Sequence, residues 1–128
     1  MLRILRAATI GILVPISMEM PAFAHAHLVS SIPAADASLA AAPPALVLHF
    51  TERVEPGFTG VTLKDSGGLV VPTGATTSSS DDPTTITVPI AARLIAGRYL
   101  VAWHALAVDG HKTSGTYGFA VALKATTP

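Results

Sequence analysis

The chain has 128 residues, of which 50% are hydrophobic, and its eight Lys and Arg residues balance eight Asp and Glu residues to a formal net charge of zero. This balance, without any basic cluster, gives no indication of a nucleic-acid partner. Cysteine is absent and all three methionines lie before residue 21, which excludes disulfides and leaves any later metal site to nitrogen and oxygen donors.

Residues 1–24 have the three parts of a secretory signal peptide. Two arginines give a positive start, residues 7–16 form an apolar stretch too short to span a bilayer, and Ala22-x-Ala24 has the small-residue spacing of a signal-peptidase site. We predict cleavage after Ala24, which exports the rest of the chain to the periplasm. Two alternatives are open at this point: a retained membrane anchor, and cleavage after Ala26.

Residues 25–128 form the predicted mature domain, and its 104 residues are enough for one hydrophobic core. Short strands bounded by turn residues are expected at 27–31, 45–50, 58–64, 69–71, 84–88, 97–107 and 115–123. The segments between them are expected to be a Pro- and Ala-rich connection at 34–44, an exposed and mobile loop at 72–83, and a connection with room for one helical turn at 89–96.

Alternating apolar residues identify the faces that should be buried. The expected core positions are Leu46, Leu48, Phe50, Tyr99, Val101, Trp103, Ala105 and Ala107. Residues 65–68, Asp-Ser-Gly-Gly, are a strong hairpin signal between two of the strands. We therefore predict an all-β fold, an antiparallel Greek-key β-sandwich or barrel of the immunoglobulin-like (cupredoxin-like) kind.

Two separate features carry chemistry. If His25 becomes the first residue, its α-amine and ring Nδ1 can close on one metal ion as a chelate. Far along the chain, the predicted turn Asp109-Gly110-His111 puts a carboxylate and an imidazole side by side. Such a turn also forms when Asp only bonds its own backbone and His faces solvent. Only the fold can bring His25 to this turn, so spacing alone leaves the metal site open.

Several motifs follow one another in order along residues 25–123. The segment opens with H-A-H-L-V-S-S-x-P-A and continues with L-x-L-H-F-T-E at 46–52 and L-x-x-G-x-Y-x-V-x-W at 94–103. D-G-H and then G-x-x-x-F-x-V at 115–121 complete the series. In this order they resemble the CopC family of periplasmic copper-binding proteins. Because the motifs cover the whole predicted mature domain, the resemblance is specific.

The resemblance implies that one Cu(II) ion per chain binds to His25, through amine and ring, and to Asp109 and His111. His27 and Glu52 are further candidates, the first as a ligand and the second as an axial or outer group. Three nitrogens and one carboxylate oxygen suit the tetragonal geometry of Cu(II). The implied role is non-enzymatic: a monomer that stores, buffers or delivers copper, with an inner-membrane copper transporter of the CopD type as a partner.

The chain departs from the family pattern at one loop, and two alternative functions are open at this point. Other family members carry a Met- and His-rich loop that holds Cu(I), but the matching residues 64–73 contain neither type, so no Cu(I) site is expected. A copper oxygenase that attacks polysaccharides would also use an amino-terminal histidine, together with an open face for dioxygen. A metal-free immunoglobulin-like interaction domain would need only the strand pattern.

Overall fold

The computed structural model describes residues 10–17 and 25–122. The predicted cleavage site and the positive start of the predicted signal peptide lie outside the described residues. Residues 10–17 form no helix or strand, and their large apolar side chains are exposed. Within the two described segments, no helix is long and apolar enough to cross a membrane.

Alternation of buried and exposed side chains explains the main strands. In β3 (Ala45–Phe50) every second residue is buried, and in β8 (Gly97–Leu106) the odd-numbered residues from Tyr99 onward are buried while their neighbours are more exposed. This period of two places one face of each strand against the core. The same alternation continues in the second half of β9 (Lys112–Val121).

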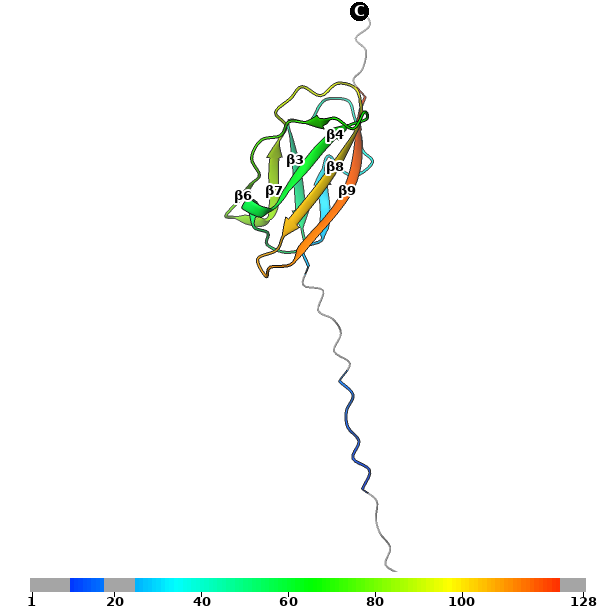
Figure 1. The fold of residues 1–128 in the computed structure, drawn as a ribbon, viewed down its shortest axis with the longest axis vertical. Helices are drawn as coiled ribbons and strands as arrows, with labels where there is room; N and C mark the ends of the chain where they lie inside the picture. The colour runs from blue at the N-terminus through cyan, green and yellow to red at the C-terminus, as the bar shows by residue number, and fades with distance from the viewer. Residues whose placement is uncertain (1–9, 18–24, 123–128) are drawn as a thin grey trace, which may run out of the picture.

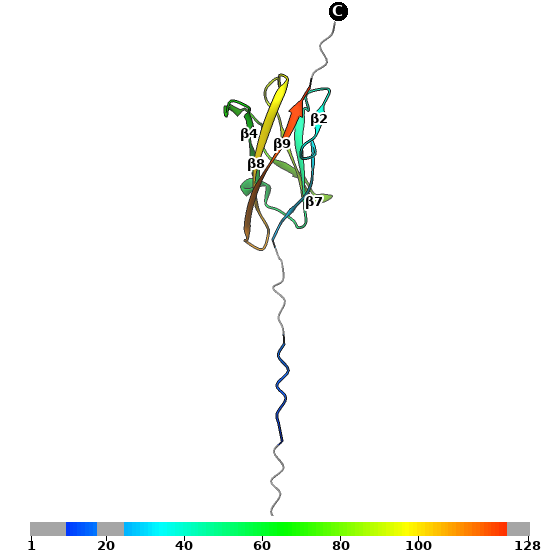
Figure 2. The same ribbon diagram turned by 90° about the vertical axis from the view of Figure 1, so that its right-hand side faces the viewer.

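The strands form two sheets that lie as separate layers, as Figures 1 and 2 show. One sheet has the order β1-β3-β7-β6, with β1 at Leu28–Ile32, β6 at Thr77–Ser79 and β7 at Asp82–Pro89. The other has the order β2-β9-β8-β4-β5, with β2 at Ser38–Leu39, β4 at Gly60–Asp65 and β5 at Val70–Val71. A single short 3-10 helix, η1 (Pro56–Phe58), lies between β3 and β4 among the described residues.

The core lies between the two sheets and contains every residue expected there. Leu46, Leu48, Phe50, Tyr99, Val101, Trp103, Ala105 and Ala107 are all buried. Phe50 from one sheet meets Trp103 from the other edge-to-face, with ring centroids 5.5 Å apart. Burial of this apolar area, at roughly 25 cal/mol per Å², is the main term that holds the layers together without disulfides.

The predicted all-β sandwich is confirmed, with corrections to its details. β2 lies inside the segment expected to be a plain connection and pairs with β9 in parallel, so the sandwich is antiparallel except at this short contact. The segment expected to be a loop at 72–83 contains β6, which pairs with β7. Both strands are two or three polar or mixed residues long and have no period to detect; neighbouring strand edges supply their hydrogen bonds.

Two further corrections concern turns. No helical turn occurs at 89–96, and the 3-10 helix lies at 56–58 instead, where a proline starts it. The last strand begins at Lys112 rather than at Gly115, because pairing with β8 starts directly after the turn, with Leu106 opposite Lys112. Its first residues are polar, so apolar alternation does not mark them.

Gly115 is the position at which the core tolerates no side chain. A Cβ atom there would lie 2.7 Å from Cζ2 of Trp103, and this indole is itself packed against Phe50. We expect Gly115→Ala to lower the free energy of unfolding by about 1–3 kcal/mol, the usual cost of overpacking. Urea unfolding followed by tryptophan fluorescence measures this change. Gly57→Ala is the control, because nothing lies within 4 Å of its added Cβ; equal stability of the two variants would contradict the prediction.

Candidate metal centre

The turn between β8 and β9 presents Asp109 and His111 at one end of the sandwich, the lower end in Figure 1. Ala107 N–H donates to the carbonyl of His111 (3.0 Å), and Gly110 N–H donates to the carbonyl of Ala107 (2.9 Å). Gly110 has a φ of +92°, in the left-handed region that favours glycine. The backbone therefore turns tightly enough to hold both side chains on one short loop.

Asp109 and His111 are paired with each other. Oδ1 of Asp109 accepts a hydrogen bond from the backbone N–H of His111 (3.0 Å), and its Oδ2 lies 3.1 Å from Nδ1 of the same residue. The pKa of the Asp109 carboxyl lies below its ordinary value of 3.8. The largest cause is the hydrogen bond from the backbone of His111, followed by the contact with the His111 ring and then by the charges of the His111 and His25 rings. Asp109 is therefore an anion at neutral pH, beside two imidazoles.

The fold brings His25 to this turn from the start of the described domain. The ring of His25 lies edge-on to the ring of His111, with centroids 4.6 Å apart and an interplanar angle of 82°. Figures 1 and 2 show the chain entering the sandwich at the same end as the β8–β9 turn. His25, Asp109 and His111 are thus neighbours, although most of the chain separates the first from the other two.

One ring nitrogen of this group has no partner. Nδ1 of His25 is buried and makes no hydrogen bond with any described residue. A buried polar atom without a partner costs free energy, so such atoms are uncommon unless something else binds them. The donor set fits a metal ion on this ground: an imidazole nitrogen lacking a bond, a second imidazole and a carboxylate.

The three side chains are adjacent, but they are not arranged as a finished site. Among residues 10–17 and 25–122, no group of three or more His, Asp or Glu side chains is placed to hold a metal ion as it stands. The Asp109–His111 pair explains this, because the carboxylate is directed at the neighbouring ring and backbone rather than outward. Metal binding would require these side chains to turn toward a shared ion.

The lower-ranked candidates lie nearby but without direct contacts to the pair in the turn. His27 is exposed, and its ring centroid lies 6.2 Å from that of His25. Glu52 is half-buried two residues after the end of β3, and no hydrogen bond or ion pair within the described part of the chain joins its carboxylate to the histidines. A further histidine, His49, already has a hydrogen-bond partner, since its Nδ1 lies 2.8 Å from Oγ1 of Thr85.

Two threonines contact the segment that carries His25. Thr51, at the end of β3, bonds residues 25 and 27, and Thr113, near the start of β9, donates to the carbonyl of Ala26 (2.7 Å). Sequence reasoning missed both residues, because a threonine in or next to a strand is common and spacing does not reveal its partner. The only sequence signal was that Thr51 falls within the 46–52 motif.

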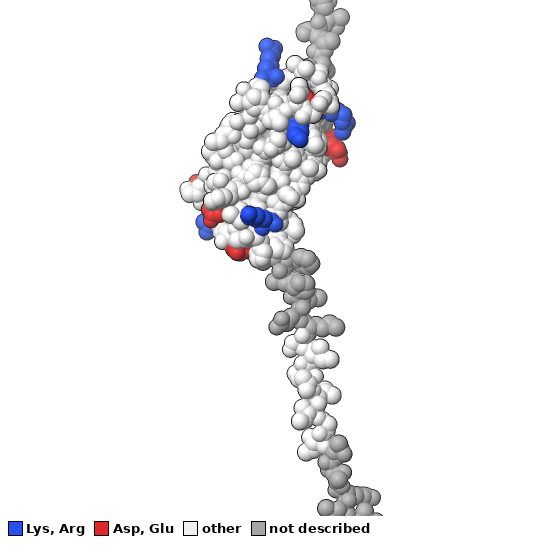
Figure 3. Space-filling view, in the orientation of Figure 1, with Lys and Arg blue, Asp and Glu red and all other residues white. Residues whose placement is uncertain are grey.

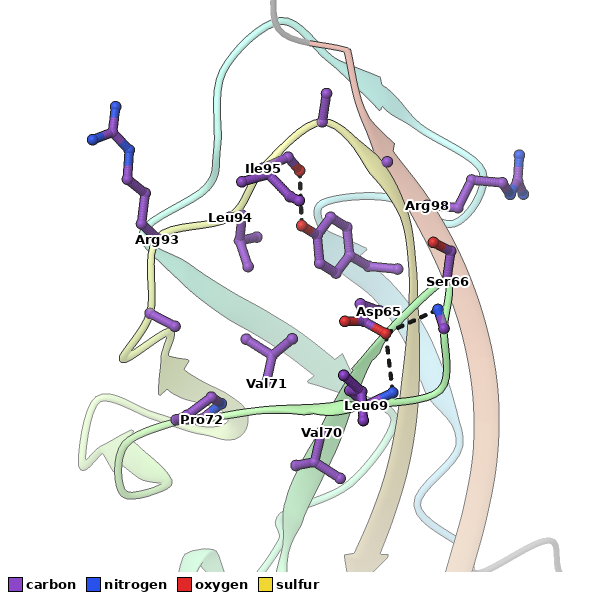
Figure 4. Close-up of a pocket in the computed structure, with 15 residues that line it drawn as sticks. Asp65, Ser66, Leu69, Val70, Val71, Pro72, Arg93, Leu94, Ile95 and Arg98 are labelled. Atoms are coloured by element: carbon purple, nitrogen blue, oxygen red, sulfur yellow. Dashed lines mark hydrogen bonds between the residues drawn. The ribbon is translucent and has the colours of Figure 1, made fainter.

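A cavity lies at the opposite end of the sandwich from the Asp109 turn. It has a volume of about 380 Å³ and lies between the β4–β5 hairpin and residues 92–99 (Figure 4). Because β8 begins at this cavity and ends at the Asp109 turn, roughly 30 Å separate the two, at about 3.3 Å per strand residue. Its lining contains no His or Met, and the Asp65 carboxylate is bonded to the turn at Gly67 and Leu69.

On the face seen in Figure 3, the charged side chains of the described residues do not form a large patch of one sign. Figure 3 shows Lys, Arg, Asp and Glu gathered toward the two ends of the domain, with both signs at each end and an uncharged middle on the visible face. The surface seen there offers no basic stripe of the kind that follows a nucleic-acid backbone.

Comparison with known proteins assigns the family. The model of the CopC domain family matches residues 28–122, which is most of the chain. The chain belongs to the CopC family. Its matched region covers the sandwich from β1 to the end of β9, including the Asp109 turn, whereas His25 and His27 precede the match.

Relatives of this CopC-family protein include curated and solved examples. Protein YobA of Escherichia coli K12 is 42% identical over 99 residues, covering 77% of this chain and 80% of YobA. The crystal structure of CopC from Methylosinus trichosporium OB3b superposes with a TM-score of 0.75 at 30% identity, covering 81% of this chain and all of that one. PcoC from Escherichia coli, described as a methionine-rich copper resistance protein, gives a TM-score of 0.70 at 32% identity, with coverage of 77% and 100%.

The titration of Asp109 tests the geometry of the turn. We expect the pKa of the Asp109 carboxyl to lie below 3.8. His111→Ala should raise this pKa only part of the way toward 3.8, because the backbone N–H of residue 111 still donates to the carboxylate. A carboxyl whose pKa is lowered in the folded state stabilises the fold above its unfolded pKa, and this contribution is lost as pH falls through the folded pKa. Carboxyl carbon NMR of the metal-free protein measures both values; a normal pKa in the parent protein would contradict the geometry.

Proposed function

We propose that the protein, once cut after Ala24, binds one Cu(II) ion through His25, Asp109 and His111 and serves periplasmic copper homeostasis by storage, buffering or delivery. The observation that carries this proposal is the buried, partnerless Nδ1 of His25 beside the ring of His111 and the Asp109 anion. Membership of a family whose named relatives include a copper resistance protein supports the choice of metal.

The chemistry of the donors favours Cu(II). The free α-amine and Nδ1 of His25 would form a chelate ring, His111 would add an imidazole, and Asp109 would add a carboxylate oxygen. Copper stands highest among the divalent first-row metals in its affinity for nitrogen and oxygen sites, and a tetragonal nitrogen and oxygen set suits it. The negative charge of Asp109 offsets part of the charge of the ion. In the uncut chain an amide replaces the amine donor, so cleavage is a step in making the site.

Burial supports His25, rather than His27, as the first residue. Ala26 is fully buried and His27 is exposed, while His25 lies against His111. Cleavage after Ala26 would discard the residue that contacts the turn and the alanine that anchors it. We therefore keep cleavage after Ala24, with residues 1–24 as the signal peptide and 25–128 as the mature domain.

We propose a binding role rather than a catalytic one. A copper oxygenase of the amino-terminal histidine type commonly has a second ring nitrogen and an open face for dioxygen and substrate, whereas an anionic Asp109 in the ligand set disfavours turnover. We further propose that the protein acts as a monomer and exchanges copper with an inner-membrane transporter of the CopD type. His27 and Glu52 are kept as outer groups of the site rather than as main ligands.

Native mass spectrometry of the exported protein tests the ligands and the amino terminus together. We expect a mature mass that begins at His25 and one tightly held Cu(II) per chain. His25→Ala should lose this tight equivalent, because it removes a ring donor and leaves only the amine. His104→Ala is the matched control, since His104 is an exposed histidine in β8 and should keep full binding. A correctly cut protein that takes up no copper would end the proposal.

Copper affinity should also depend on pH. The α-amine, with an ordinary pKa of about 7.7–8.0, and the imidazole nitrogens that would bind the metal must be unprotonated to bind. We expect the Cu(II) dissociation constant to rise steadily as pH falls from 8.5 to 5.5. Competition with a chelator whose own pH dependence is known measures the slope. If the affinity does not change across this range, neither the amine nor an imidazole is a ligand.

A further inference from the structure

We propose that Thr51 and Thr113 are positioning residues that hold residues 25–27 in the one placement that keeps His25 against the Asp109 turn. The inference rests on the proposed copper site and adds to it two residues that are not ligands. It follows from four hydrogen bonds that join this short segment to both sheets.

Thr51 binds the segment on both sides of Ala26. Its hydroxyl accepts from the backbone N–H of His27 (3.0 Å) and donates to the carbonyl of His25 (3.1 Å). Its own backbone N–H donates to the carbonyl of His27 (2.9 Å). One hydroxyl thus acts as acceptor and donor at once, which serine and threonine can do and valine cannot.

Thr113 binds the same segment from the other sheet. Its hydroxyl donates to the carbonyl of Ala26 at 2.7 Å, and it lies only two residues after His111 on β9. The strand that directly follows the proposed ligand His111 therefore also holds the backbone next to His25. Ala26 itself is fully buried as part of the hydrophobic core, so the segment is fixed by packing as well as by hydrogen bonds.

These contacts matter because the segment is short and would be a chain end after cleavage. Two residues, His25 and Ala26, would precede His27, and chain ends are poorly ordered unless they are tied down. A ligand that must be ordered when the metal binds spends part of the binding free energy on that ordering. Holding the carbonyl of His25 in advance removes this cost and aims the amine and ring of the residue at the turn.

The prediction is that Thr51→Val weakens Cu(II) binding without unfolding the domain. Valine keeps the shape of threonine and removes only the hydroxyl, and Thr51 is exposed at the end of its strand. We expect the Cu(II) dissociation constant of the mature protein to rise about tenfold or more, the size typical of residues that orient a metal ligand. Thr51→Ser should restore most of the affinity, and Thr113→Val should act in the same direction.

The test measures Cu(II) affinity by chelator competition, together with the Cu(II) EPR spectrum and the hydrogen exchange of the His27 amide in the metal-free protein. Thr62→Val is the matched control, because Thr62 is an exposed strand threonine on β4 in the other sheet. Loss of positioning should change the EPR hyperfine splitting and speed exchange of the His27 amide in Thr51→Val but not in Thr62→Val. Combining Thr51→Val with His25→Ala should cost less additional affinity than Thr51→Val costs in the parent protein, because only the amine is left for the threonine to position.

The outcomes separate this inference from the proposed function. If the parent protein binds one Cu(II) and Thr51→Val binds it with the same affinity and spectrum, the positioning role is overturned and the copper site stands. If Thr51→Val costs as much affinity in the His25→Ala background as in the parent protein, the positioning role is also overturned, because the effect would not pass through His25. If the parent protein binds no copper, the proposed function itself fails.

Discussion

The unbroken pairing of β8 with β9, from Gly97 opposite Val121 to Leu106 opposite Lys112, is the constraint on which the rest of the structure depends. Its register turns the aromatic face of β8 toward the other sheet and places Trp103 directly over Gly115. The pairing ends at a tight turn between the two strands, and this turn contains both Asp109 and His111. A shift by one residue would reverse the face of every side chain in the strand, and with it both the core and the proposed site.

The proposed copper site combines one part that is built into this hairpin with one part that is brought to it. Asp109 and His111 are held by the turn and by each other, so their placement depends on local structure. His25 has no such local support, because its placement depends on a buried alanine and on threonines from two sheets. This division explains why export, folding and metal binding are coupled in our proposal: the amine donor exists only after cleavage, and its position exists only after the sandwich has formed.

Much of the fold could be predicted from residues, and the reasons for the failures are physical. Leu46, Leu48 and Phe50 alternate clearly because one face of β3 meets the core, and the hairpin at 65–68 is marked by its Asp and Gly residues. β2 and β6 could not be predicted, since strands of two or three residues are held by a neighbouring edge rather than by their own pattern. The family was correctly identified from ordered motifs, and the match to residues 28–122 bears it out. The ligand set remains a proposal.

The sequence by itself determined the period of the strands, the turn chemistry of Asp109-Gly110-His111, the absence of sulfur donors after residue 20, and the small-residue spacing before His25. These are local properties, set by neighbouring residues along the chain. Only the tertiary structure decided that the ring of His25 lies 4.6 Å from that of His111, that its Nδ1 has no hydrogen-bond partner among the described residues, and that two threonines hold the segment in place. Such contacts join residues far apart in sequence, and they arise only when the packing of two sheets has fixed the distance between their strands.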